Sequence, residues 1–406
     1  MNASVMERPS ARNGVAVKTI LATFFRLGCT SFGGPIAHFG YFREEFVARR
    51  RWLEDSQFAE LLALAQTLPG PASSQLGFTV GMLMGGWPGA LAAWTGFTLP
   101  SAVLMVTFAL ARRFVPGPST QGLIHGLGIV AAAVVAQAVL LMQRQLAPDR
   151  VRATIAVLGA AIALLAPPHA SMIAAVSAGA TAGLLFCSAV DPIGEQGVFR
   201  PPLSKTTGTI LLSLFLLLLL FPPLILAHRS QSSLSVFNAF YRSGALVFGG
   251  GHVVLPLLES ATVARGWLSE PTFLAGYGAA QAVPGPLFSF AAYLGAALNV
   301  APNGMEGACL ALLSIFLPGL LLVSGILPFW AHLRGRNLVR AAIAGVNASV
   351  VGVLGAALYR PVWISAILRP VDLVIALIAF LLLVHWRVHP WKVVVATAAV
   401  SVLWLR

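Results

Sequence analysis

Long uninterrupted apolar segments restrict the fold of this chain more than any other feature. Sixteen consecutive residues, 211–226, contain one Ser, two Pro and no charged side chain. About twenty apolar residues cross a bilayer as a helix, whereas membrane β-barrel strands alternate apolar and polar residues over about ten positions. Charged residues make up only 10% of the chain, against about 25% in soluble domains. We therefore predict an all-α integral membrane protein.

An internal repeat divides the chain into two halves. Each half contains the same ordered series of short segments, separated by 215 to 218 residues. This shared order and spacing indicate a duplicated unit rather than chance similarity. The pairs are FRLG (25–28) with YRSG (241–244), SFGG (31–34) with VFGG (247–250), WL (52–53) with WL (267–268), QTLPGP (66–71) with QAVPGP (281–286), and LPS (99–101) with LPG (317–319).

The repeat predicts how the spans are grouped. We expect a polytopic helical bundle of about ten to thirteen spans, made of two homologous halves, with broken or re-entrant helices at the PGP motifs. Residues 1–190 would form the N-terminal repeat, 191–233 a linker and connecting transmembrane helix, and 234–406 the C-terminal repeat. Halves related by a pseudo-two-fold axis are typical of transporters with a central site, although some channels are duplicated too.

The net charge of +13 comes mainly from Arg and Lys in short connections between apolar segments. Such residues anchor a membrane protein to anionic headgroups, and their excess can also attract an anionic substrate. We expect no nucleic-acid partner. The three cysteines have no metal-ligand spacing, and no Walker lysine loop, HExxH, CxxC or GxSxG motif is present. We therefore predict a protein that is not an enzyme and uses no metal or cofactor.

The PGP motifs are the first candidate substrate site. Two prolines remove two backbone donors and the glycine relaxes the turn, so a helix breaks there. A helix broken at membrane depth must be buried in protein or line a cavity, and its second part presents free N–H groups that favour an anion. The alternative is a kink that serves packing alone. The predicted substrate-binding residues of this group are Pro69, Gly70, Pro71, Ser73, Ser74, Pro284, Gly285, Pro286 and Ser289.

Other candidates lie near these motifs. Paired glycines after Phe32 and Phe248 permit either a backbone break at the substrate or close helix packing. A glutamine before each PGP motif either lines the pathway or satisfies the opened backbone. A histidine follows each glycine pair, at positions that do not align, as a proton carrier or a structural hydrogen bonder. These candidates are Gly33, Gly34, Gly249, Gly250, Gln66, Gln281, His38 and His252.

Charged residues complete the set. Arg26 and Arg242 interrupt apolar segments six residues before each Phe-Gly. A charge near the bilayer centre costs about 2.5–3.5 kcal/mol, so its duplication indicates a purpose, and two guanidinium groups match a tetrahedral dianion. The alternatives are snorkelling or capping of carbonyls freed by the glycine break. Glu44 and Glu259, at roughly equivalent positions, either pair with an arginine or carry a coupling proton.

These segments together resemble the chromate transporter family, in its long, two-domain form. The resemblance covers most of both halves, roughly 20–150 and 235–360. It rests on FRLGCTSFGGPIAH (25–38), RRWLEDSQFAELLALAQTLPGPASSQLG (50–77), GFTLPS (96–101), FGGGHVVLPLLE (248–259), GWLSEPTFLAGYGAAQAVPGP (266–286) and FLPG (316–319).

The resemblance implies a multi-pass protein of the bacterial plasma (inner) membrane that acts as a secondary transporter, exports chromate and so confers chromate resistance. Its partners would be the lipid bilayer and chromate or a related oxyanion, and a homo-oligomer is possible. Chromate and sulfate are both tetrahedral dianions, so a transporter or channel for sulfate or another inorganic anion is the alternative.

Overall fold

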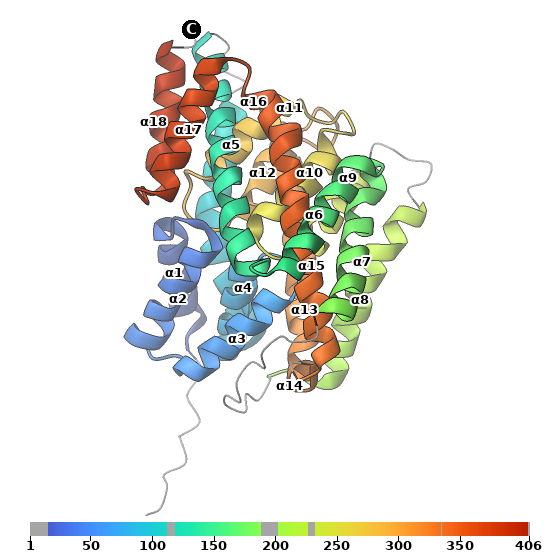
Figure 1. Cartoon of the computed structure of the whole chain (residues 1–406). Helices are drawn as coiled ribbons and strands as arrows, with labels where there is room; N and C mark the ends of the chain where they lie inside the picture. Colours follow the sequence, from blue (N-terminus) through green and yellow to red (C-terminus); the bar gives the residue numbers. More distant parts are fainter. Residues whose placement is uncertain (1–14, 112–117, 188–201, 226–231, 334, 405–406) are drawn as a thin grey trace, which may run out of the picture.

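The computed structural model describes residues 15–111, 118–187, 202–225, 232–333 and 335–404, and within these ranges the chain is a bundle of helices joined by turns (Figure 1). The predicted all-helical membrane fold is confirmed. Much of the predicted linker, 191–201 and 226–231, lies outside the described residues. The described segments that are long and apolar enough to cross a membrane are Ala72–Ala111, Gln121–Leu146, Lys205–Pro222, Gly304–Leu333 and Asn337–Ala366.

The helices form two series, one in each half of the chain, with α8 between them. The first half contains α1 (Val17–Thr30), α2 (Gly34–Arg43), a π-helical turn (Glu44–Arg49), α3 (Asp55–Thr67), α4 (Ala72–Ala111), α5 (Pro118–Leu146), α6 (Arg150–Leu165) and α7 (Pro168–Phe186). After α8 (Lys205–Ile225), the second half contains α9 (Ser233–Ala245), α10 (Val254–Thr262), α11 (Glu270–Ala280), α12 (Phe290–Ala297), α13 (Gly304–Ile326), α14 (Trp330–Leu333), α15 (Asn337–Ala357), α16 (Ile364–Ala366), α17 (Pro370–Val384) and α18 (Pro390–Trp404).

The Phe-Gly-Gly motif of the first half is the tip of a helical hairpin. α1 has 14 residues, about 21 Å of helix, which is too short to cross a hydrocarbon core of about 30 Å. Gly33 and Gly34 follow it with φ of +102° and +75°, a region that L residues with a side chain rarely adopt. The chain then returns along α1, because the Phe24 ring lies 5.8 Å from that of Phe42 and 5.1 Å from that of Phe46.

The PGP motif is the tip of a second hairpin, formed by α3 and the beginning of α4. α4 itself consists of two arms, 72–84 and 87–111, because Gly85 and Gly86 have non-helical backbone angles. The arms approach closely at this kink: a Cβ on Gly81 would lie 2.4 Å from the carbonyl oxygen of Gly89. The chain therefore reaches the tip along α3 and returns from it along the first arm of α4.

The second half repeats both hairpins. α9 and α10 flank Gly249 and Gly250, and α11 and α12 flank the second PGP motif. The Phe273 and Phe290 rings, one from each arm of the latter hairpin, are 5.3 Å apart. Figure 1 shows α1, α2 and α3 toward one end of the bundle and α10, α11 and α16 toward the other, so the halves are inverted relative to each other. Inverted repeats are a recurring transporter architecture.

Long helices intertwine the two halves. α5 of the first half packs against α17 and α18 of the second, and α15 of the second packs against α6 and α7 of the first. Small residues permit the close approach: a Cβ on Gly345 of α15 would lie 2.1 Å from the carbonyl oxygen of Gly179 in α7. The Ser349 hydroxyl also donates to the Ala175 carbonyl at 2.7 Å. Each half thus completes the packing of the other.

Candidate functional site at the hairpin tips

The hairpin tips of the two halves meet through reciprocal backbone hydrogen bonds. Gly70 N–H, in the first PGP turn, donates to the carbonyl of Val247 at 2.7 Å. Gly285 N–H, in the second PGP turn, donates to the carbonyl of Ser31 at 2.9 Å. Ser31 and Val247 occupy the same position of the repeat, directly before Phe-Gly-Gly. The four motifs that the repeat singles out therefore meet in two reciprocal pairs across the junction between the halves.

Each PGP glycine needs both its backbone angle and its lack of a side chain. Gly70 has φ +121° and Gly285 has φ +97°. A Cβ on Gly70 would lie 3.1 Å from Cα of Gly319, and one on Gly285 would lie 3.0 Å from Oγ of Ser101. Gly319 and Ser101 are also repeat equivalents, at the end of the LPG and LPS segments. Each tip is thus seated on the long helix of the opposite half.

The side chains that surround the two PGP turns differ between the halves. At the first PGP turn, the Gln75 amide nitrogen donates to the carbonyls of Pro69 at 2.9 Å and Gly319 at 3.1 Å. Gln75 carries no repeat signal in the sequence, since Phe290 stands at its equivalent position in the second half. At the second turn, His38 is buried with its ring edge against Phe97 at 5.2 Å.

The histidine tautomer follows from its contact. His38 Nε2 lies 3.2 Å from the Ser31 carbonyl oxygen, which also accepts from Gly285. A carbonyl can only accept, so Nε2 carries the proton and Nδ1 of the neutral ring is an acceptor. Nδ1 has no partner among the described residues.

Unpartnered polar atoms gather at this junction. Buried polar groups in folded proteins almost always have a partner, so each exception calls for a water, an ion or a ligand. Thr98 stands one turn before Ser101 on the helix face that meets Gly285. Buried atoms near the tips without a hydrogen-bond partner among the described residues are Ser31 Oγ, His38 Nδ1, Ser74 Oγ, Gln75 Oε1, Thr98 Oγ1 and Gln281 Nε2. Three hydroxyls and one amide among them can donate to an oxyanion.

The remaining uncharged candidates lie at or near the same tips. Ser73 and Ser289 are buried directly after the two PGP turns. Gly249 and Gly250 have φ of +76° and +148° and face Met142 of α5. Gln66 is exposed on α3. The structure therefore brings together most of the neutral residues that the sequence selected.

The predicted arginines and glutamates lie on the segments that flank the tips rather than in the turns themselves. Arg26 forms a salt bridge with Glu45, one residue beyond the predicted Glu44, which is exposed. Glu259 is half-buried on α10. His252 Nδ1 lies 2.7 Å from the Tyr277 hydroxyl, an interaction that ties the start of α10 to α11.

Arg242 is half-buried beside a second arginine, Arg265, which was not among the residues predicted from the sequence. Partial burial and the charge of Arg242 lower the pKa of Arg265. Arg265 lies 5.1 Å over the Trp267 ring, and Arg50 lies 5.2 Å over the Trp52 ring in the first half. The repeated Arg-x-Trp spacing was the signal in the sequence for both residues.

Comparisons with known proteins agree with this architecture. A family model described as chromate transporter matches residues 18–184 and 234–402. The chain is 27% identical to the chromate transport protein of Pseudomonas aeruginosa over 353 residues, which cover 83% of this chain and 79% of that protein. It is also 27% identical to the chromate transport protein of Cupriavidus metallidurans over 392 residues, covering 94% and 92%.

A shorter relative corresponds to one part of the chain. An uncharacterized transporter of Bacillus subtilis is 34% identical over 135 residues, which cover 33% of this chain and 74% of that protein. No solved structure matches the chain. The two family segments together span well over half of the sequence and fall on either side of α8. The chain is therefore a multi-pass membrane protein and belongs to the chromate transporter family, whose members are transporters and not enzymes.

Proposed function

We propose that this protein is a secondary transporter that exports chromate across the bacterial plasma membrane and so confers chromate resistance. Family membership and the two relatives named chromate transport proteins support this substrate. The observation that carries the proposal is the junction of four hairpin tips between inverted halves, with buried donor groups left unpartnered. Substrate sites at the interface between inverted repeats are a recurring feature of transporters.

The substrate would bind where the tips meet. Hydroxyl groups of Ser31, Ser73, Ser74, Thr98 and Ser289 would donate to the oxyanion, together with the Gln281 amide and backbone N–H groups near the Gly-Gly and PGP turns. Arg26 on α1 and Arg242 on α9, each five residues before the junction in the sequence, would balance its charge from beside the site. Moving a negative charge out of an inside-negative cell is favourable by about 2.3 kcal/mol per 100 mV, so export needs no further coupling on energetic grounds.

Chromate export is tested in cells that carry or lack this single gene. Cells with the gene should accumulate less chromate and survive higher concentrations, and inside-out vesicles should take up chromate with saturation. Equal accumulation in both strains, with the protein present in the membrane, would refute the proposal.

Transport of sulfate or another inorganic anion is the second candidate, because neutral donors recognise any tetrahedral dianion. Sulfate in modest excess should abolish chromate uptake by vesicles if the site prefers sulfate, and should leave it nearly unchanged if the site prefers chromate. Flux that rises linearly with substrate concentration would indicate a channel instead.

A further inference from the structure

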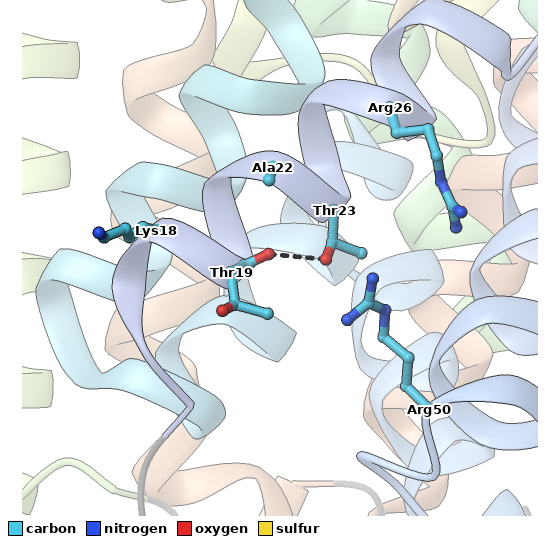
Figure 2. Close-up of a pocket in the computed structure, with 6 residues that line it drawn as sticks. All are labelled: Lys18, Thr19, Ala22, Thr23, Arg26 and Arg50. Atoms are coloured by element: carbon cyan, nitrogen blue, oxygen red, sulfur yellow. Dashed lines mark hydrogen bonds between the residues drawn. The ribbon is translucent and has the colours of Figure 1, made fainter.

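A cationic pocket lies on α1, away from the hairpin tips (Figure 2). Its volume is about 310 Å³, and it is lined by Lys18, Thr19, Ala22, Thr23, Arg26 and Arg50. Figure 2 shows the Arg26 and Arg50 side chains converging from two segments at one side of this hollow. Because one water takes about 30 Å³ of liquid volume, the pocket has room for a tetrahedral oxyanion with some of its hydration shell.

The arginines of this pocket already hold an anion, the carboxylate of Glu45. Arg50 Nε lies 2.5 Å from Oε1 of Glu45, Arg26 binds Oε2, and Arg49 Nη1 lies 3.4 Å from Oε2. The Glu45 side chain is 5% exposed, whereas those of Arg26 and Arg50 are 44% and 30% exposed. One buried carboxylate therefore pairs with three arginines, so the cluster keeps a net positive charge at the protein surface.

The position of Glu45 results from one extra residue in the first half. The repeat offset falls from 216 at Phe-Gly-Gly to 215 at Trp-Leu, and Glu45 lies in the π-helical turn Glu44–Arg49. Such turns accommodate a single inserted residue and occur frequently at functional sites. An offset of 215 places Ser260 opposite Glu45, and an offset of 216 places Ala261 there, so the second half has no carboxylate at this position. Arg242 and Arg265 form no salt bridge among the described residues.

We propose that this pocket is an oxyanion-binding vestibule in which the Glu45 carboxylate is an internal competitor that an incoming tetrahedral oxyanion displaces from Arg26 and Arg50. Guanidinium groups bind carboxylates and tetrahedral oxyanions with the same paired donors, so the two anions exclude each other. The inference rests on the proposed function in that the oxyanion is the one transported. Arg50 also lies 5.2 Å over the Trp52 ring, a contact that does not involve Glu45.

Binding in neutral detergent tests the competition without any flux. Chromate binding is measured by equilibrium dialysis for the wild-type chain, Glu45→Gln, and the matched control Glu44→Gln, which removes an exposed carboxylate from the same turn. If the arginines are free of Glu45 for about one-tenth of the time, Glu45→Gln binds chromate about tenfold more tightly. Glu44→Gln should bind like the wild type, and Arg50→Gln should lose the added affinity in the Glu45→Gln background.

Unchanged or weaker binding by a folded Glu45→Gln variant would overturn the inference. If that variant does not elute as a single species, Glu45→Asp replaces it in the binding measurement. The shorter Asp side chain should bind the arginines less well, so chromate affinity should still rise. Vesicles with and without phosphatidylglycerol provide a third measurement. Loss of chromate binding only with phosphatidylglycerol would identify a lipid phosphate as the occupant and reject the vestibule. If the wild-type chain binds sulfate in this pocket but exports no chromate, the proposed function is refuted while the oxyanion-binding vestibule is not.

Discussion

At the scale of single residues, the hairpin-tip junction combines well-satisfied backbone groups with unsatisfied side chains. Ser31 contributes both: its carbonyl accepts from Gly285 and His38, while its hydroxyl has no partner among the described residues. An unpaired buried hydroxyl lowers stability, and the proposed substrate site would use these hydroxyl groups at that cost in stability.

Thr98 allows a test of this trade-off. Thr98→Val keeps the side-chain shape and removes the unpartnered hydroxyl, so we expect the unfolding free energy to rise by about 1 kcal/mol while chromate flux falls. Thr262 is the control, because its buried hydroxyl donates to the Leu258 carbonyl at 2.6 Å. Thr262→Val should not be stabilised, and its flux should match the wild type. Melting temperature in detergent and vesicle uptake measure the two effects, and a Thr98→Val protein with normal uptake would exclude Thr98 from the site.

The PGP glycine of the second half provides a steric prediction. Gly285→Ala places a Cβ 3.0 Å from Ser101 Oγ at φ +97°, so it should lower the unfolding free energy by about 1–3 kcal/mol and reduce transport. Gly40→Ala in α2 is the control, since a Cβ there meets nothing within 4 Å. It should melt at or slightly above the wild-type temperature. Equal melting temperatures for the two variants would contradict the close packing of Gly285 against Ser101.

Glu45 predicts a pH dependence. Burial raises the pKa of its carboxyl, but the hydrogen bond from Arg50 and the charge of Arg26 outweigh burial and hold the pKa below its ordinary value. A carboxyl with a lowered folded-state pKa contributes stability above its unfolded-state pKa, about 4.3, and loses it as pH falls through the folded-state value. Glu45→Gln should therefore melt below the wild type at neutral pH, and this difference should shrink below pH about 4. A pH-independent difference would contradict the ion pairs.

At the scale of elements, small residues on α15 determine how the halves interlock. Gly345 faces Gly179 and Gly183 of α7, and Gly352 faces Ala156 of α6. Ridges of ordinary side chains would hold these helices 8–10 Å apart, so glycine permits a closer crossing. The contact between α15 and the last helices of the first half thus depends on positions that show no motif in the sequence.

Two glycines on the same helix test this contact. Gly345→Ala puts a Cβ 2.1 Å from the Gly179 carbonyl oxygen, whereas a Cβ on Gly355 meets nothing within 4 Å. We expect Gly345→Ala to lower the unfolding free energy by about 1–3 kcal/mol, the usual cost of overpacking. Gly355→Ala should be neutral or slightly stabilising because alanine favours the helix. Thermal melting in detergent compares them, and a stable Gly345→Ala protein would argue against close packing of α15 and α7.

At the scale of the whole molecule, neither half has a complete set of neighbours. α5 needs α17 and α18, α15 needs α6 and α7, and both PGP tips are seated on the opposite half. The duplicated halves are therefore packed together as one body.

Separate expression of the halves tests this interdependence. A chain cut within 191–201 should yield halves that aggregate when produced alone and that elute together from a sizing column when produced together, because each buries apolar helix faces of the other. Chromate uptake should return only with co-expression. A first half that is monodisperse and thermally stable alone would contradict the intertwined packing.

The sequence by itself determined the helical membrane class, the duplication and the helix breaks at the PGP motifs. Apolar content, repeat offsets and PGP or Gly-Gly spacing are local properties, and backbone sterics act on them wherever the chain lies. Only the tertiary structure decided which tips meet, that the halves are inverted and exchange helices, and that Glu45 rather than Glu44 binds Arg26. These depend on contacts between residues far apart in the chain and on a one-residue shift within a helical turn, which rotates a side chain by about 100°.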